Sequence, residues 1–147
     1  MIAIGCDHGG FELKQPIIEY FEQNGIEYKD FGTNSAQSVD YPPIAAAVAR
    51  SVASGECEKG ILLCGTGIGM SLAANKVRGI RAAACSDHFS ARYTRLHNDA
   101  NILCLGARVI GSGVAVELVD IFLNTGFEGG KHLRRIEAIA KIENGEM

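Results

Sequence analysis

Short apolar runs alternate with segments of helical periodicity along the 147 residues of the chain. The runs that have the length and composition of β-strands are Met1–Cys6, Ile26–Phe31, Gly60–Cys64, Ile80–Cys85 and Ile102–Leu105. The segments with apolar residues at helical spacing are Phe11–Asn24, Ile44–Ser54, Ser71–Val77, Asp87–Leu96, Gly113–Asn124 and His132–Glu143. This order predicts successive β-α-β units, and therefore a Rossmann-like three-layer α-β-α sandwich around a five-stranded parallel sheet. The length suits a single domain, 1–147.

The last of these helices, His132–Glu143, carries an apolar stripe that includes Leu133, Ile136 and Ile139. It follows the last predicted strand, so no further strand lies beyond it for the helix to cover. We therefore expect this C-terminal helix to pack on a partner subunit rather than on its own sheet.

Composition narrows the classes of partner. Hydrophobic residues make up 47% of the chain and charged residues 21%, and the formal net charge is −3. Without a basic block, neither nucleic acid nor an anionic membrane surface is expected as a partner, and no apolar run approaches the ~18 residues that would span a bilayer. The five cysteines, an odd number without a C-x-x-C pair, disfavour a disulfide framework and a zinc site. These cysteines, together with the absence of a leader segment before the first strand, indicate a reducing, cytoplasmic compartment.

Polar and small residues follow four of the five predicted strands. In a parallel sheet with right-handed crossovers, the loops that follow the strands share the carboxyl edge, where ligands bind in open α/β sheets. The loops concerned are 7–10 (Asp-His-Gly-Gly), 64–69 (Cys-Gly-Thr-Gly-Ile-Gly), 86–88 (Ser-Asp-His) and 106–108 (Gly-Ala-Arg). The segment 97–99 (His-Asn-Asp), directly before the fifth strand, is grouped with them. We expect the functional site at this edge.

The glycine-rich loop that begins at Cys64 leads into a helix. Its spacing is neither the G-x-G-x-x-G of a dinucleotide loop after the first strand nor that of a P-loop. Its backbone N–H groups offer an anion site, either for a phosphate or for a developing oxyanion. At a helix start, the Cys64 thiol is expected to ionise more readily than a free thiol, which suits a nucleophile or a general base. The alternative is a small buried apolar residue, the role expected of Cys6, Cys85 and Cys104.

Histidine chemistry is indicated at two positions. His8 follows an aspartate at the expected edge, and His97, in the run H-N-D, suits a general acid near neutral pH. His88 and His132 are expected on solvated faces. A metal site built from Asp7, His8 and His97 lacks the close ligand spacing of a zinc helix and is not favoured.

The densest positive patch of this acidic chain consists of Lys131, His132, Arg134 and Arg135. It has two interpretations. The patch is either a solvated basic face or an anion site that places positive charge on a substrate phosphate.

Several stretches together resemble one family of sugar isomerases. They are GCDHGGFELK at 5–14, DYP at 40–42, GILLCGTGIGMSLAANKVRGIRAA at 60–83, HNDANILCLGARVIG at 97–111 and EGGKHLRRIEAI at 128–139. In this order they span nearly the whole chain and resemble ribose-5-phosphate isomerase type B, whose family also includes the galactose-6-phosphate isomerase subunits. The resemblance implies interconversion of the aldose ribose 5-phosphate and the ketose ribulose 5-phosphate, with no cofactor and no metal.

The resemblance also implies residue roles. Cys64 would be the base that moves a proton between C2 and C1 through a cis-enediolate, with Thr66 hydrogen-bonding beside it, and His97 would open the furanose ring. The residues implied in substrate binding are Asp7 and Asn98 for sugar oxygens, the amides of Gly65, Gly67, Ile68 and Gly69 for the enediolate oxygen, and His8, Arg108, Lys131 and Arg135 for the phosphate.

Two positions bear on the subtype. Family members without the cysteine place a carboxylate base at the position of Met70, which cannot serve here, so Cys64 is the candidate. Lys131 stands where the family has arginine, and a lysine offers a point charge in place of a planar fork. This difference leaves room for six-carbon or unphosphorylated sugars.

The resemblance implies a homodimer, with a tetramer as the alternative, in which His97, Asn98 and Arg108 reach into the Cys64 site of the other subunit. Two other functions stay open at this point. One is a non-catalytic nucleotide-binding module on the same architecture, and the other is a subunit of a galactose-6-phosphate isomerase that needs a different partner chain.

Overall fold

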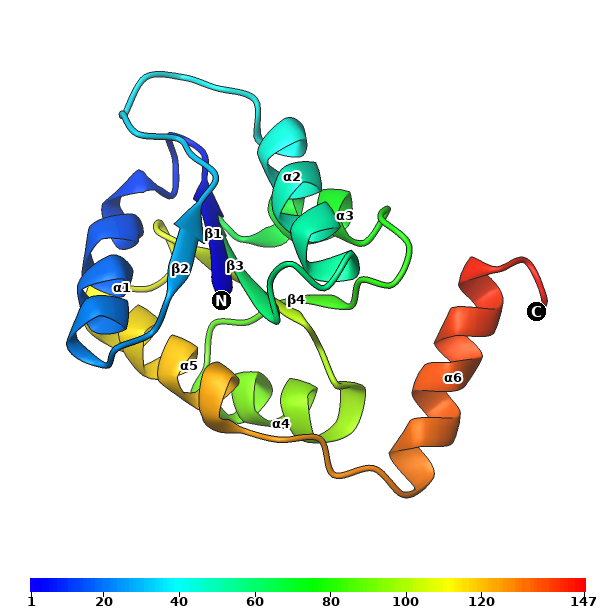
Figure 1. The fold of residues 1–147 in the computed structure, drawn as a ribbon. Coiled ribbons are helices and arrows are strands. Elements are labelled where there is room, and N and C mark those ends of the chain that lie inside the picture. Colours follow the sequence, from blue (N-terminus) through cyan, green and yellow to red (C-terminus); the bar gives the residue numbers. More distant parts are fainter.

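A five-stranded, all-parallel sheet is the middle layer of the computed structural model, which describes residues 1–147 (Figure 1). The strands are β1 (Ile2–Cys6), β2 (Tyr28–Asp30), β3 (Lys59–Cys64), β4 (Ala82–Ala84) and β5 (Ile102–Gly106), in the order β2-β1-β3-β5-β4. The predicted class and the five predicted strands are confirmed. Strands β2 and β4 are shorter than the runs Ile26–Phe31 and Ile80–Cys85, because each lies at an edge and pairs along one side only.

Two layers of helices cover the sheet, and one helix extends from it. The helices are α1 (Phe11–Gln23), α2 (Tyr41–Ala53), α3 (Ile68–Ala74), α4 (His88–Asn98), α5 (Ser112–Asn124) and α6 (Lys131–Glu143). Helices α1, α4 and α5 cover one face of the sheet, and α2 and α3 cover the other (Figure 1). Helix α2 starts at Tyr41, before the alanine-rich run Ile44–Ser54. Pro42 and Pro43, which suit a helix start, lie in its first turn, where no intrahelical N–H donor is needed. None of the helices is long and apolar enough to cross a membrane.

Alternate residues of β3 contribute to two separate cores. Ile61 and Leu63 pack in the layer of α1 and α5, whereas Leu62 and Cys64 pack in the layer of α2 and α3. Because both faces of β3 are covered, these side chains are all buried, which explains the unbroken apolar run in the sequence. The carboxyl end of β3, where Cys64 lies, is therefore held from both sides of the sheet.

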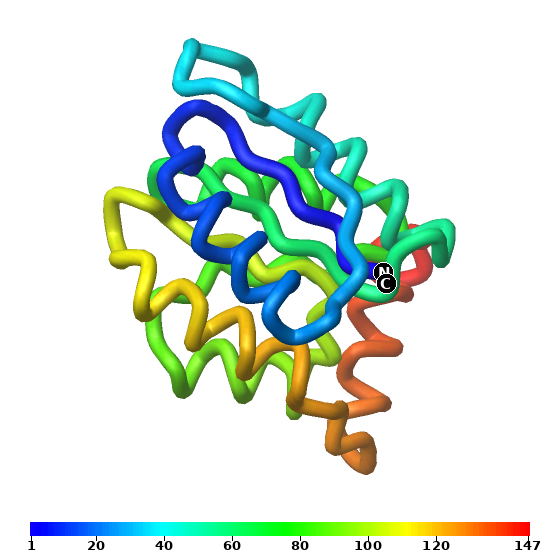
Figure 2. Tube along the Cα trace, turned by 60° about the vertical axis from the view of Figure 1, so that its left-hand side comes forward, coloured from blue at the N-terminus to red at the C-terminus, as the bar shows by residue number.

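Helix α6 lies outside the three layers. Segment 125–130 carries the chain from α5 past the end of α4, and α6 projects from there (Figure 1, Figure 2). Its residues His132 and Ile136 are buried, whereas Leu133, Ile139 and Ile142 remain exposed. The chain thus leaves an apolar stripe of α6 uncovered. Packing of this stripe on a partner subunit stays a prediction.

Two glycines allow the loops of the carboxyl edge to touch backbone to backbone. A Cβ on Gly10 would lie 2.3 Å from the carbonyl carbon of Leu63, and a Cβ on Gly106 would lie 2.6 Å from the Cα of Thr66. Neither backbone can retreat, because Leu63 belongs to the central strand and Thr66 to the turn that follows it. The loop after β1 and the end of β5 therefore press directly on the segment that carries Cys64.

Gly10→Ala is expected to destabilise the fold, because the added methyl group overlaps the backbone of Leu63. Overpacking of this kind costs about 1–3 kcal/mol, which corresponds to a drop of several degrees in melting temperature. Gly113→Ala is the matched control: nothing lies within 4 Å of its added Cβ, and alanine inside a helix is about 0.5–1 kcal/mol better than glycine. Thermal unfolding followed by circular dichroism compares the two variants. A Gly10→Ala chain as stable as the parent would contradict the close contact.

Candidate active site

Cys64 is the last residue of β3 and begins the turn into α3. Its side chain is 5% exposed, and the N–H of Gly67 donates to its Sγ at 3.0 Å. A backbone donor directed at sulfur offers a partner to the thiolate form. Gly67 has a φ of 80°, in the left-handed region that favours glycine, which explains why the tight turn needs glycine at this position.

Thr66 lies in the same turn, and its Oγ1 accepts the N–H of Ile68 at 3.2 Å. Four amides were predicted to face an enediolate oxygen. Those of Gly67 and Ile68 already have partners inside the turn, namely the sulfur of Cys64 and the hydroxyl of Thr66. The amides of Gly65 and Gly69 donate no hydrogen bond to the side chain of Cys64 or of Thr66.

Tyr41, which the sequence analysis did not single out, lies against the turn. A Cβ on Gly69 would lie 2.8 Å from the Cζ atom of the Tyr41 ring and 3.1 Å from its hydroxyl oxygen. The residue is the first of α2 and is 36% exposed, so its hydroxyl can meet a ligand at this edge. The only signal in the sequence was the D-Y-P stretch, which contributed to the resemblance without a role.

Arg108 follows β5 and lies beside the glycine loop of its own chain. A Cβ on Gly65 would lie 3.3 Å from Nη1 of Arg108, and the N–H of Arg108 donates to the Gly65 carbonyl at 3.0 Å. The resemblance implied that this arginine reaches the site of another subunit. The structure instead places it at the Cys64 loop of the same chain, because β3 and β5 are neighbours and their loops meet.

Asp7 and His8 follow β1 at the same edge. Oδ1 of the buried Asp7 accepts the N–H of Gly10 at 3.1 Å, which closes the turn against the end of β3. Nδ1 of His8 accepts the N–H of Val39 at 3.2 Å. In neutral His8 the proton therefore lies on Nε2, which leaves an N–H donor for a ligand.

Burial makes three of the other thiols unreactive. Burial raises the pKa of Cys6 to about 11 and that of Cys85 to about 11. Burial also raises the pKa of Cys104 well above its ordinary value. These thiols stay protonated at neutral pH, which is the role expected of small buried residues.

His97 and Asn98 lie at the opposite edge of the sheet, so their grouping with the loops at the carboxyl edge was wrong. They form the end of α4, which returns across the sheet before β5 begins. Cys64 pairs with Gly106 at the carboxyl end of β5, whereas its amino end lies about 13 Å away along the strand. Asp7, His8 and His97, the metal-ligand set that the sequence did not favour, are therefore not brought together within one chain.

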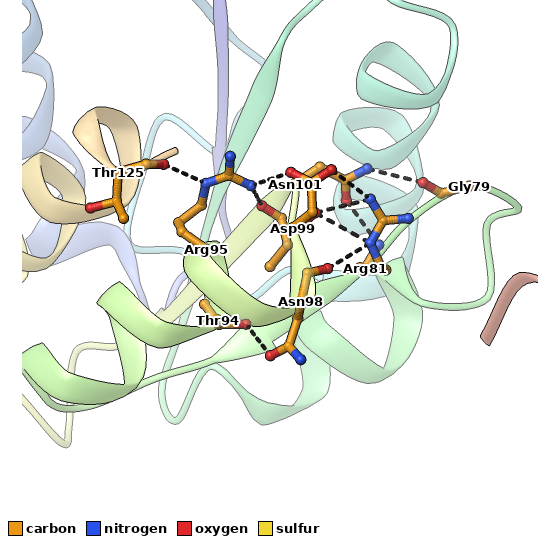
Figure 3. A network of polar contacts seen from close by, with 9 residues as sticks. Gly79, Arg81, Thr94, Arg95, Asn98, Asp99, Asn101 and Thr125 are labelled. Atoms are coloured by element: carbon orange, nitrogen blue, oxygen red, sulfur yellow. Dashed lines mark hydrogen bonds and ion pairs between the residues drawn. The ribbon is translucent and has the colours of Figure 1, made fainter. Parts of the chain in front are cut away.

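A network of polar contacts holds the end of α4 in place (Figure 3). Nε of Arg81 donates to the Asn98 carbonyl at 2.9 Å, and the hydroxyl of Thr94 donates to Oδ1 of Asn98 at 3.1 Å. The ring of His97 stacks on that of His132 in α6, with the ring centroids 4.0 Å apart. Burial, together with the charge of His97, lowers the pKa of His132, which favours its neutral form.

Comparison with known proteins identifies the family. The family model described as Ribose/Galactose Isomerase matches residues 2–139. The ribose-5-phosphate isomerase B of Escherichia coli (strain K12) is 51% identical over 142 residues, which cover 97% of this chain and 95% of that protein. The chain belongs to the ribose/galactose isomerase family.

Solved structures agree with this family membership. The ribose-5-phosphate isomerase B of Clostridium thermocellum matches with a TM-score of 0.97 at 51% identity and covers 99% of both chains. A ribose 5-phosphate isomerase from Thermotoga maritima matches with a TM-score of 0.93 at 54% identity, over 95% of this chain and 97% of that one. The chain is thus an isomerase of the intramolecular oxidoreductase class, with a sugar-phosphate isomerase role.

In this isomerase, the residues predicted from the sequence divide into two groups. The Cys64 group, at the carboxyl edge, consists of Asp7, His8, Cys64, Gly65, Thr66, Gly67, Ile68, Gly69 and Arg108. The His97 group, at the junction of α4 and α6, consists of His97, Asn98, Lys131 and Arg135. A single chain therefore presents both sets of predicted residues but keeps them at opposite ends of the sheet.

The raised pKa values of Cys6 and Cys85 predict a loss of stability at high pH. An unfolded thiol titrates at the ordinary value of 9.0, whereas these two titrate at about 11 in the folded chain. Between these values the folded state keeps protons that the unfolded state has lost. The stabilisation is therefore complete below the unfolded pKa and disappears as the pH rises through the folded one.

Urea unfolding across this pH range measures the effect. The Cys6→Ala/Cys85→Ala double variant is the control, because it lacks both thiols and should lose less free energy of unfolding over the same range. An equal loss in the parent and the variant would show that other groups, such as Tyr20, whose pKa is raised to about 12, carry the dependence instead.

Proposed function

We propose that this isomerase interconverts ribose 5-phosphate and ribulose 5-phosphate through a cis-enediolate, without a metal or a cofactor. The observation that carries the proposal is the position of Cys64. Its thiol has an N–H donor at 3.0 Å and lies where the loops after β1, β3 and β5 meet. We place the reaction in the non-oxidative branch of the pentose phosphate pathway and in the cytoplasm, since five unpaired cysteines suit a reducing compartment.

In the proposed reaction, the Cys64 thiolate takes the proton from C2 of the open-chain aldose, and negative charge develops on O1. The free amides of Gly65 and Gly69, with the hydroxyl of Thr66, are the donors available to stabilise that charge. The thiol then returns its proton to C1. Transfer of the hydroxyl proton from O2 to O1 completes the ketose, so no redox partner is needed.

Cations for the substrate phosphate are present in both groups. In the Cys64 group, His8 offers its Nε2–H and Arg108 its guanidinium. In the His97 group, Lys131 and Arg135 are exposed and four residues apart in α6, so they share one face of that helix. Asp7 and Asn98 supply oxygens and an amide for the sugar hydroxyl groups.

The separation of the two groups supports a site shared between two chains. In the proposed homodimer, the Cys64 group of one chain meets His97 and Asn98 of the other. Lys131 and Arg135 come with them because they flank His132, whose ring stacks on that of His97. The exposed apolar stripe of α6 offers surface for this contact. A tetramer would consist of two such dimers, and the two-fold arrangement gives two equal sites per dimer.

Cys64→Ala is expected to lower kcat for ribose 5-phosphate by at least about 10²-fold, because it removes the proposed base. Its melting temperature and substrate binding should change little, since the substitution removes only the sulfur atom and its proton. Cys57→Ala is the matched control, because Cys57 is also buried in the α2 and α3 layer but lies away from the loop. The assay on the purified single chain also excludes a need for a different partner chain. A Cys64→Ala enzyme that keeps most of its kcat would place the base elsewhere.

Mixed refolding tests the shared site. Cys64→Ala and His97→Asn chains, each inactive alone, are unfolded, combined in equal amounts and refolded. Random pairing makes about half of the dimers mixed, and each mixed dimer has one intact site of two, so about a quarter of the parent activity should return. The control mixes Cys64→Ala chains with chains that carry both substitutions, which cannot form an intact site. If parent chains refold well but the test mixture stays inactive, each site is built within one chain.

A further inference from the structure

Three side chains with metal-binding atoms face one another where α4 meets α6. Nε2 of His97 lies 3.8 Å from Oε2 of Glu128, and Nε2 of His132 lies 3.9 Å from Oε1 of the same carboxylate. All three ligand atoms lie within 4.8 Å of one another. The two imidazole rings stack with 12° between their planes. Glu128 had no role in the sequence analysis, and His132 was expected to be solvated.

Backbone contacts hold this cluster together. The N–H of Glu128 donates to the carbonyl of Leu96, the residue before His97, at 3.0 Å. The N–H of His132 donates to the Gly129 carbonyl at 3.1 Å. The end of α4 is itself fixed by Arg81 and the contacts around it (Figure 3). The three side chains therefore meet because the fold places their backbones together, not because long side chains happen to approach.

The Glu128 carboxylate has no hydrogen-bond donor within reach in the cluster. Its distances of 3.8 and 3.9 Å to the two ring nitrogens exceed the range of a hydrogen bond. Tyr93 packs its ring edge-on to His97, with the ring centroids 5.0 Å apart. Two imidazole nitrogens and one carboxylate thus face a common space without satisfying one another.

We propose that His97, Glu128 and His132 bind a divalent cation of the zinc class, and that this cation inhibits the isomerase. Two histidines and a glutamate form a known ligand set of zinc, with a fourth position left for water. Imidazole ligands select Zn²⁺, Co²⁺ and Ni²⁺ over Mg²⁺ and Ca²⁺.

The required movements are small. With metal–ligand distances of about 2.0–2.2 Å, tetrahedral ligand atoms lie about 3.4 Å apart. The pairs at 3.8 and 3.9 Å must therefore close by about half an ångström, and the two imidazole nitrogens, which lie within 4.8 Å of each other, by up to about 1.4 Å. The stacked rings must also tilt so that both lone pairs converge. The side chains of His97 and Glu128, 39% and 56% exposed, can make these movements, whereas that of His132, 10% exposed, stays in place.

Local charge sets the character of the site. Glu128 favours a bound cation, whereas Lys131 and Arg135, next to His132, oppose it. This balance suits a reversible inhibitor rather than a resident cofactor. The inhibition rests on the proposed function: an ion on Nε2 occupies the lone pair with which His97 would exchange a proton with the furanose ring.

Calorimetric titration of the metal-free enzyme with Zn²⁺, and the absorption spectrum of a Co²⁺ complex, test the site independently of activity. We expect one ion per chain. Glu128→Gln and His132→Asn should each weaken binding by at least about tenfold, since the loss of even an outer-shell partner has an effect of this size. His88→Gln is the matched control, because His88 also faces a glutamate, Glu117, at 2.5 Å but lacks a third ligand. No binding, or equal binding by Glu128→Gln and the parent, would overturn the site.

Cys64→Ala distinguishes this site from a thiol site, because the variant should bind Zn²⁺ with the affinity of the parent. Loss of binding in Cys64→Ala alone would place the ion on the sulfur and overturn the proposal. In the activity assay, Zn²⁺ should inhibit the parent and a chelator should reverse the inhibition, while Glu128→Gln stays active at the same Zn²⁺ concentration. Binding without inhibition would overturn the inhibitory role. An enzyme that binds Zn²⁺ but does not isomerise ribose 5-phosphate would contradict the proposed function and leave the metal site supported.

Discussion

The loops after β1, β3 and β5 meet through their backbones, and the whole Cys64 group depends on this contact. The N–H groups of Ala107 and Arg108 donate to the carbonyls of Cys64 and Gly65 at 2.9 and 3.0 Å. The N–H of Asp7 donates to the Leu63 carbonyl at 3.1 Å. These bonds continue the ladders of the three central strands past the ends of the strands. The thiol is therefore positioned by the backbone of the sheet, and glycines are required where one loop lies against another.

The opposite edge of the sheet is organised by charged side chains instead. Arg95 is 6% exposed, and its Nη1 donates to Oδ1 of Asp99 at 2.8 Å and to the Ala100 carbonyl at 2.7 Å. Its Nε donates to the Thr125 carbonyl at 3.0 Å, so one guanidinium links the end of α4 to the end of α5 (Figure 3). Asp99 has a φ of 44°, and this left-handed residue ends α4. The network fixes the backbone next to His97 while the imidazole remains accessible.

The parallel sheet could be predicted because the alternation of strands and helices is periodic along the chain. The rule that loops after parallel strands share an edge also placed Asp7, Cys64 and Arg108 together. It failed for His97, which precedes its strand and lies at the end of a returning helix. Tyr41 and Glu128 escaped prediction because their contacts with Gly69 and His97 join residues distant in the sequence, and no periodic pattern indicates such pairs. For the same reason, the free α6 stripe indicated a partner surface but could not show where the partner chain would lie.

His8 links the loop after β1 to segment 33–40. Its Nδ1 holds the N–H of Val39, two residues before Tyr41, through a bond that only an unprotonated nitrogen can accept. The other end of this segment is held by Lys14, whose ammonium donates to the Thr33 carbonyl at 2.7 Å. The ammonium of Lys14 can only donate a hydrogen bond, whereas the bond at Val39 requires a nitrogen lone pair on the imidazole ring. The two ends of the segment are therefore held in opposite ways, by a side-chain donor at Thr33 and by a side-chain acceptor at Val39, beside the tyrosine that lies against Gly69.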